Sequence, residues 1–236
     1  MININYMKRI FFIIPVLCLL ASCKSKEEKA LELIDQQMFQ TLYDYESYQP
    51  VETKIDSAFT SPYFSDSIIA MVMLYDEFQD QAEDYKDEAD DAQSSMEIWS
   101  DSYSSYARSR YNDAKREWVD NTILYFQTSK KAILTLMMAA EAIKDFEPKF
   151  CGWQVYHKYR CKSKGGHALL SESIYIIDKD LKEITHTIDI DDDDYIKAKK
   201  RIDEIMEDLS DNNDLQEYND LIDKLDELIE GYELLR

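Results

Sequence analysis

A long heptad repeat of apolar residues constrains the fold of this chain more than any other feature. Between Ile68 and Tyr106 the apolar side chains recur at steps that alternate strictly between three and four residues. This spacing places them in one stripe along an α-helix, and a stripe sustained over more than five heptads is typical of coiled-coil packing. Its members are Ile68, Met71, Tyr75, Phe78, Ala82, Tyr85, Ala89, Ala92, Met96, Trp99, Tyr103 and Tyr106.

The repeat is interrupted at Arg110 and Asp113, and a second apolar stripe then continues until Pro148. Its members are Trp118, Tyr125, Ala132, Leu136, Ala139, Ile143 and Phe146. Two stripes of similar length on either side of a phase break predict an antiparallel, coiled-coil-like helical hairpin over residues 66–147. We expect its tip near residues 107–112.

A hairpin centred there would place Tyr85 near Ile133 and Phe78 near Ala140. The alternative is one unbroken helix of about eighty residues, about 120 Å long at 1.5 Å per residue. Such a helix needs a second chain to cover its stripe, so this alternative implies a homodimer.

The segments beside the hairpin also contain helical patterns. A first helix is expected from about Glu27 to Tyr48, where Pro50 stops it, and residues 50–65 are expected to be a loop. Residues 191–236 are expected to form two C-terminal helices separated by a short polar break.

Residues 148–190 change to the two-residue period of a β-strand. Three of the four glycines lie between residues 152 and 166, and apolar and polar residues alternate from Trp153 to Cys161. Further strands are expected over 174–177 and 184–190, which predicts a three-stranded antiparallel meander. So small a sheet must pack against helices to be stable. The predicted fold class is therefore mainly α, with a small β-meander.

The N-terminus has the pattern of a secretory signal over residues 1–22. Lys8 and Arg9 precede an apolar run that ends at Leu20, and this run is too short to span a bilayer. The following Leu20-Ala21-Ser22-Cys23 resembles a bacterial lipobox. The resemblance implies that Cys23 is diacylated and becomes the mature N-terminus, so that residues 23–65 comprise a tether, the first helix and the loop. Acyl groups on Cys23 would then be the contact with the membrane.

The charge balance is strongly acidic. With 27 basic and 48 acidic residues the net charge is −21, which repels the phosphates of nucleic acids, so no nucleic-acid partner is expected. Cationic peptides or proteins are alternative partners. No later stretch reaches eighteen consecutive apolar residues, so no second membrane segment is expected.

No catalytic motif is found in the sequence, which lacks G-x-S-x-G, P-loop, H-E-x-x-H and C-x-x-C patterns. We therefore expect no catalytic residues and no cofactor. A hydrolase that uses a pair of carboxylates is a remaining alternative, and it would need a cleft that a long hairpin with few glycine loops does not offer.

The histidines of the meander give little support for a metal site. His157 and His186 could share one face of neighbouring strands, but no close ligand spacing accompanies them, so packing within the sheet is the expected role.

If residues 152–161 are one strand, Cys151 and Cys161 lie about 33 Å apart, too far for a disulfide. Free, partly buried thiols are expected.

An acidic run after the meander has the alternate spacing of a calcium loop at Asp189, Asp191 and Asp193. However, Asp194 stands where such a loop needs glycine, and Lys200 where it needs glutamate. The run is therefore expected to cap the helix that follows.

One cluster has the residue types that anchor protein interfaces, aromatics and arginine at an exposed end. It lies near the predicted hairpin tip and consists of Trp99, Tyr103, Tyr106, Arg108, Arg110 and Tyr111. The competing interpretation is that Trp99, Tyr103 and Tyr106 continue the heptad seam and are buried. Arg108 and Arg110 distinguish the two, because a purely internal seam does not need two cations there.

Two further segments carry a resemblance, besides the lipobox: Ser47–Lys54 and the segment from Gly152-Trp153-Gln154-Val155 to Gly166. Through them most of the mature chain resembles uncharacterised envelope lipoproteins of gut Bacteroidota. The resemblance implies location in the cell envelope, lipid-anchored at the outer membrane or cell surface, and supplies no site residues. Together these features predict a non-enzymatic, lipid-anchored protein that binds another protein or acts as a scaffold.

Overall fold

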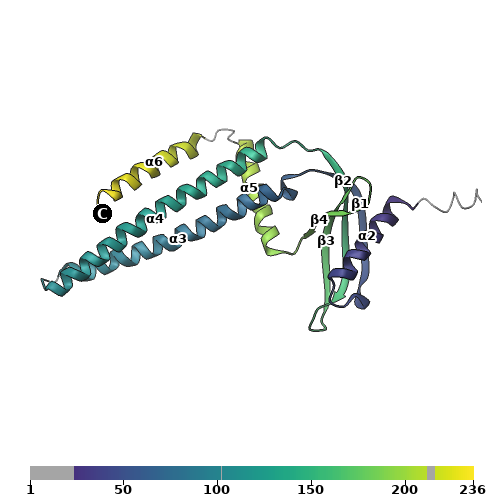
Figure 1. Cartoon of the computed structure of the whole chain (residues 1–236), viewed down its shortest axis with the longest axis horizontal. Helices are drawn as coiled ribbons and strands as arrows, with labels where there is room; N and C mark the ends of the chain where they lie inside the picture. Colours follow the sequence, from purple (N-terminus) through teal and green to yellow (C-terminus); the bar gives the residue numbers. More distant parts are fainter. Residues whose placement is uncertain (1–23, 102, 212–215) are drawn as a thin grey trace, which may run out of the picture. The chain divides into compact units, whose positions relative to one another are not determined.

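The computed structural model describes residues 24–101, 103–211 and 216–236 (Figure 1). The predicted signal sequence and Cys23 lie outside these residues. The described chain is mainly helical, with five α-helices and one small antiparallel sheet. It divides into two compact units, which we call the sheet unit, up to Phe59 with Phe150–Asp191, and the helical unit, Thr60–Lys149 with Asp192–Arg236.

The helical unit is built on the predicted hairpin. Helices α3 (Asp66–Ser100) and α4 (Ser105–Lys144) run antiparallel and side by side, which rules out the single straight helix (Figure 1). Small side chains line the seam, among them Ala82 and Ala89 of α3 and Ala114 of α4, all buried. Small residues let two helix backbones approach closely along a long contact.

The tip of the hairpin lies earlier in the chain than predicted. The helices are joined at residues 101–104, and α4 has already begun at Ser105, because the Ser104 hydroxyl accepts a hydrogen bond from the amide of Ala107 at 3.1 Å and caps the helix. The predicted tip at residues 107–112 is therefore wrong.

The pairing across the hairpin shifts with the tip. Phe78 faces Lys131, whose Nζ lies 5.9 Å from the centre of the ring, and the predicted neighbour Ala140 packs instead in the core with Ile68 and Val72. The predicted pairings of Phe78 with Ala140 and of Tyr85 with Ile133 assumed the later tip and are displaced by this shift.

Two further helices complete the helical unit, as predicted. Helix α5 (Asp193–Asp211) buries Ala198, Ile202 and Ile205 against α3 and the end of α4. Helix α6 (Gln216–Glu233) lies along α4 (Figure 1), where Lys130 Nζ contacts both carboxylate oxygens of Asp226 at 2.6 Å. No helix of the described residues is long and apolar enough to cross a bilayer.

The sheet unit holds four antiparallel strands in the order β1-β2-β3-β4. Strands β2 (Phe150–Lys162), β3 (Ala168–Asp178) and β4 (Ile184–Asp189) form the predicted meander. Strand β1 (Gln49–Phe59) pairs with the outer edge of β2, so the loop predicted over residues 50–65 is wrong for most of its length. Nearly every residue of β1 is exposed, and a strand without a buried face shows no apolar alternation.

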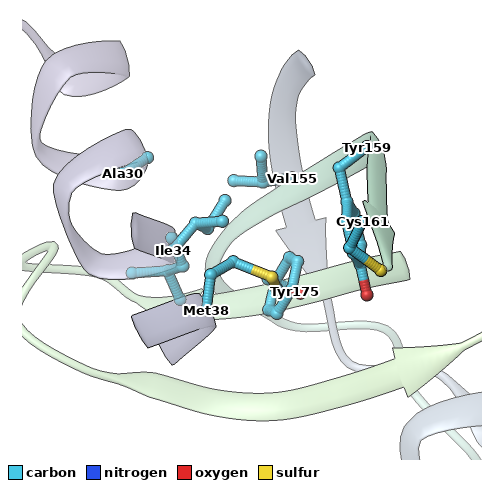
Figure 2. Close-up of a cluster of buried hydrophobic side chains, with 8 residues drawn as sticks. Ala30, Ile34, Met38, Val155, Tyr159, Cys161 and Tyr175 are labelled. Atoms are coloured by element: carbon cyan, nitrogen blue, oxygen red, sulfur yellow. The ribbon is translucent and has the colours of Figure 1, made fainter. Parts of the chain in front are cut away.

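Helix α2 (Lys26–Thr41) covers one face of the sheet. It is capped by Ser25 and Glu28 in a reciprocal capping box, and it ends earlier than the predicted Tyr48, before a short 3-10 turn at Tyr45–Ser47. Its buried side chains Ala30, Ile34 and Met38 pack on the sheet (Figure 2). Their partners are Val155, Tyr159, Cys161, Tyr175 and Ile177.

Cys151 and Cys161 are free thiols, as predicted, because both lie on the single strand β2.

The same strand requires glycine at position 152. A Cβ on Gly152 would lie 1.9 Å from the carbonyl oxygen of Ile177 on β3, far inside van der Waals contact. The close pairing of β2 with β3 therefore requires a residue without a Cβ at position 152.

Candidate functional site

The tip of the helical hairpin contains an open pocket of about 290 Å³. It is lined by Trp99 and Ser100 at the end of α3, by Tyr103 in the turn, and by Arg108 and Tyr111 in the first turns of α4. Four of the six predicted interaction residues therefore line one pocket, while Tyr106 and Arg110 lie beside it in the sequence without lining it. Ser100, which the residue-type argument did not single out, is the fifth member.

Tyr103 and Tyr106 of the tip face water. Tyr103 is 98% exposed and Tyr106 64% exposed, whereas Trp99 is half-buried and its ring meets that of Tyr106 edge to face at 5.7 Å. The alternative that these three side chains continue a buried seam is therefore wrong for both tyrosines. The seam ends with Ala107, which is 1% exposed, because the helices separate into the turn beyond it.

The two arginines of the tip form no ion pair within the described part of this acidic chain. Arg116, Arg201 and Arg236 form ion pairs, whereas Arg108, Arg110 and, in the sheet unit, Arg160 form none with any described residue and are exposed. A guanidinium group keeps its charge at every physiological pH and donates hydrogen bonds in a planar fork that fits a carboxylate. An unpaired arginine in a chain of net charge −21 is thus available to an external anion.

The pocket offers groups suited to binding. Its lining supplies aromatic faces, phenol and serine hydroxyls and one guanidinium, with no carboxylate, thiol or imidazole among its members. Aromatic surface beside an arginine is the combination that protein interfaces favour at their centres. Such a pocket can hold an apolar side chain and bind an adjacent carboxylate at Arg108.

The histidines of the sheet unit have different surroundings from one another. His157 on β2 is fully buried; its Nε2 lies 2.8 Å from the Tyr48 hydroxyl and its Nδ1 2.8 Å from Thr53 Oγ1. His186 lies on β4, and β3 separates the two strands, so the histidines are not on neighbouring strands. Within the described ranges, no three His, Cys, Asp or Glu side chains are grouped to hold a metal ion.

The acidic run before α5 caps that helix, as predicted. Asp192 Oδ1 accepts hydrogen bonds of 3.0 Å from the amides of Asp194 and Tyr195, and Asp193 and Asp194 lie in the first turn. Carboxylates there interact favourably with the helix dipole. The capping residue itself, Asp192, lies between the alternate positions of the calcium-like spacing.

A second aromatic cluster, in the sheet unit, was not predicted. Phe59, Phe150 and Trp153 contact one another in series, and the first two are 51% and 39% exposed. Phe59 belongs to β1, a strand that the sequence pattern does not predict, so its pairing with Phe150 could not be predicted either. The sequence signal for this cluster was limited to Phe150 and Trp153, two aromatic residues near the start of the insert.

Comparison of the chain with protein-family models, with curated proteins and with solved structures finds no match.

Proposed function

We propose that this protein is a non-enzymatic, lipid-anchored component of a bacterial cell envelope that binds another protein through the tip of its helical hairpin. The observation that carries the proposal is that two residues line the same pocket at the tip: Tyr103, which is 98% exposed, and Arg108, which forms no ion pair with a described residue. Large aromatic side chains and arginines are the residues that dominate binding energy at interfaces.

The hairpin itself suits presentation of this pocket. Helix α3 has 35 residues, which corresponds to about 52 Å at 1.5 Å per residue. Two such helices packed along a continuous seam form a stiff support, so the tip pocket needs little ordering when it binds. The lipobox at Cys23 supports an anchor near the N-terminus, in the outer membrane or at the cell surface.

The chemistry of the pocket indicates the partner surface. We infer an apolar or aromatic side chain that enters between Tyr103 and Trp99, next to a carboxylate that pairs with Arg108. A carboxylate is favoured because a charge-assisted bond to a guanidinium is about twice as strong as a neutral one.

A photocrosslinker tests this proposal. We would replace Tyr103 by benzoyl-phenylalanine in the full-length protein, expose intact cells to light and identify the captured proteins. Benzoyl-phenylalanine at Tyr43, which is 71% exposed on the sheet unit, is the matched control. A discrete partner captured at position 103 and not at position 43 supports the proposal, and the absence of any discrete adduct at position 103 contradicts it.

A paired set of variants separates recognition from charge. In a pull-down without the crosslinker, Tyr103→Ala with Arg108→Ala is expected to abolish binding of the identified partner, whereas Tyr43→Ala with Arg160→Ala removes one exposed tyrosine and one exposed, unpaired arginine elsewhere and is expected to keep it. Capture should persist at high salt if the aromatic pocket dominates.

One observation favours a second candidate function, the sequestration of cationic peptides. Within residues 80–91 of α3, seven exposed carboxylates form no ion pair with any described residue; they are Asp80, Glu83, Asp84, Asp87, Glu88, Asp90 and Asp91. Charge-driven capture of a basic peptide would weaken steeply between low and high salt and would survive the double substitution at the tip.

A further inference from the structure

Three aromatic rings form a continuous cluster at one end of the sheet unit. The rings of Phe59 and Phe150 meet at 6.0 Å and an interplanar angle of 71°, and those of Phe150 and Trp153 at 5.9 Å and 82°. Phe59 closes β1, while Phe150 opens β2 directly opposite it. We call this cluster the aromatic end.

Two lysines border the aromatic end. Lys26 Nζ lies 3.8 Å from the centre of a Trp153 ring, and Lys179 Nζ lies 5.7 Å from that of Phe150. The indole Nε1 of Trp153 also donates a hydrogen bond of 3.3 Å to the carbonyl oxygen of Lys179. Neither ammonium group forms an ion pair with a described residue, so both charges are directed to the aromatic faces and to the solvent.

Trp153 packs against the core of the unit, whereas the two phenylalanines of the aromatic end lie outside that core. The core lies between α2 and the sheet and is built on Ile34, Met38, Val155 and Tyr175 (Figure 2). Phe59 and Phe150 belong to no buried cluster and keep 51% and 39% of their surface exposed. Exposure of two adjacent phenylalanine rings is unfavourable in water, because each apolar Å² contributes about 25 cal/mol when it is covered.

The position of the aromatic end in the chain indicates what covers it. Lys26 is the first residue of α2 and stands three residues after Cys23. Three residues of extended chain span at most about 11 Å. If Cys23 carries acyl chains, as proposed above, Lys26 and the Trp153 ring beneath it are therefore held close to the lipid headgroups.

We propose that the aromatic end is a membrane-contact surface that docks the sheet unit on the phospholipid interface; this rests on the proposed lipid anchor at Cys23. Aromatic rings concentrate at the headgroup level of membranes, where one side is apolar and the other hydrated. Lys26 and Lys179 would reach phosphate groups with their ammonium ends while their alkyl stems stay on the rings. The acyl chains and the aromatic end then act as two linked contacts, which together hold the unit in one orientation.

The far end of α2 supplies a matched control. Phe39 and Tyr43 are 69% and 71% exposed, so they are at least as accessible as the aromatic end. Phe39 is thirteen residues from Lys26, about 20 Å along the helix. The tether therefore brings Lys26, and not Phe39, to the membrane surface.

Tryptophan quenching in vesicles tests the proposal with the full mature protein purified from cell membranes. Trp99→Phe and Trp118→Phe leave Trp153 as the single tryptophan, and the protein is reconstituted in vesicles of phosphatidylethanolamine and phosphatidylglycerol that contain brominated phospholipid. The control carries Trp153→Phe and Phe39→Trp in the same background. We expect loss of most of the Trp153 emission and a blue shift, with neither change at position 39.

The outcomes also separate this proposal from the anchor. An acylated protein that stays with the vesicles while Trp153 is unquenched overturns the membrane-contact surface and leaves the anchor intact. If mass spectrometry finds no acyl groups on Cys23, the proposed anchor is overturned. In that protein, quenching of Trp153 would still support the membrane-contact surface, whereas a protein that stays in solution would overturn both proposals. Phe59→Ser, a change at an exposed position, is expected to reduce the quenching, and unchanged quenching in that variant contradicts the role of the phenylalanines.

Discussion

Thr53 Oγ1 lies 2.8 Å from Nδ1 of His157, and this hydrogen bond joins the exposed edge strand β1 to the buried middle of the sheet. The other ring nitrogen of His157 lies 2.8 Å from the hydroxyl of Tyr48. A neutral imidazole donates from one nitrogen and accepts at the other, and both hydroxyls can take the complementary role. The two hydrogen bonds therefore suit the uncharged form of His157.

The stability of the sheet unit is expected to fall as the pH falls below about 6.5, the ordinary pKa of histidine. Burial lowers the pKa of His157 in the folded state, so the unfolded chain binds a proton first. The free energy of unfolding then declines by at most about 1.4 kcal/mol per pH unit and levels off below the folded pKa. Urea unfolding followed by Trp153 emission, with Trp99→Phe and Trp118→Phe, measures this slope between pH 8 and 5.5.

His157→Gln is the comparison for this slope, because glutamine keeps one donor and one acceptor but does not titrate. Burial raises the pKa of the neighbouring Tyr48 to about 12, and also raises that of Tyr159, so neither phenol titrates in this range. The slope should become shallower in the variant. Equal slopes in the two proteins would show that His157 does not cause the pH dependence.

Gly152→Ala is expected to destabilise the sheet unit by about 2–4 kcal/mol, because a Cβ would overlap the carbonyl oxygen of Ile177 and force the two strands apart. The same substitution at Gly231 in α6 meets no atom within 4 Å and is expected to stabilise the protein by about 0.5–1 kcal/mol. Chemical denaturation of both variants checks the opposite signs. A neutral Gly152→Ala would mean that β2 and β3 pair differently from the register described here.

The parts of the fold that the sequence predicts are those with a buried face. The stripe from Ile68 onward predicts α3, and the alternation from Trp153 to Cys161 predicts β2, because one side of each element packs on other residues. Strand β1 lacks such a face, and it is held by backbone pairing and by the Thr53–His157 hydrogen bond, which leave no periodic signal.

The position of the hairpin tip depended on one local contact. The phase break near Arg110 suggested a turn there, but the Ser104 cap begins α4 before it, and the helix continues through the break. The candidate site was still found from residue types alone, since Trp99, Tyr103 and Arg108 lie close to either turn. To predict which of the six residues line the pocket, the correct position of the turn would have been needed.

Tyr232→Ala is expected to loosen α6 from α4. The Tyr232 ring contacts Trp118 at 5.5 Å and Phe126 at 5.7 Å, both edge to face. Aromatic pairs contribute about 0.5–1.5 kcal/mol each, so the loss is about 1–3 kcal/mol, and α6 should open locally. Hydrogen exchange measured by mass spectrometry should show faster exchange in α6 and little change in α3.

Leu234→Ala serves as the control for this experiment, because Leu234 is 88% exposed just beyond α6. It should leave the exchange of α6 unchanged. Equal exchange in the wild type and the Tyr232→Ala variant would indicate that the Lys130–Asp226 ion pair and Leu225 hold α6 without the aromatic contacts.

Two substitutions at the hairpin tip, at Tyr103 and at Ala107, are expected to affect the stability of the protein very differently. Tyr103→Ala should change the free energy of unfolding by less than about 0.5 kcal/mol, because the side chain is almost fully exposed. Ala107→Leu should destabilise the hairpin by about 1–3 kcal/mol, because Ala107 is buried where α3 and α4 meet. Thermal unfolding of the two variants measures both effects. If Tyr103→Ala were the more destabilising change, the tyrosine would serve the fold of the tip, and the case for a recognition pocket there would lose its main support.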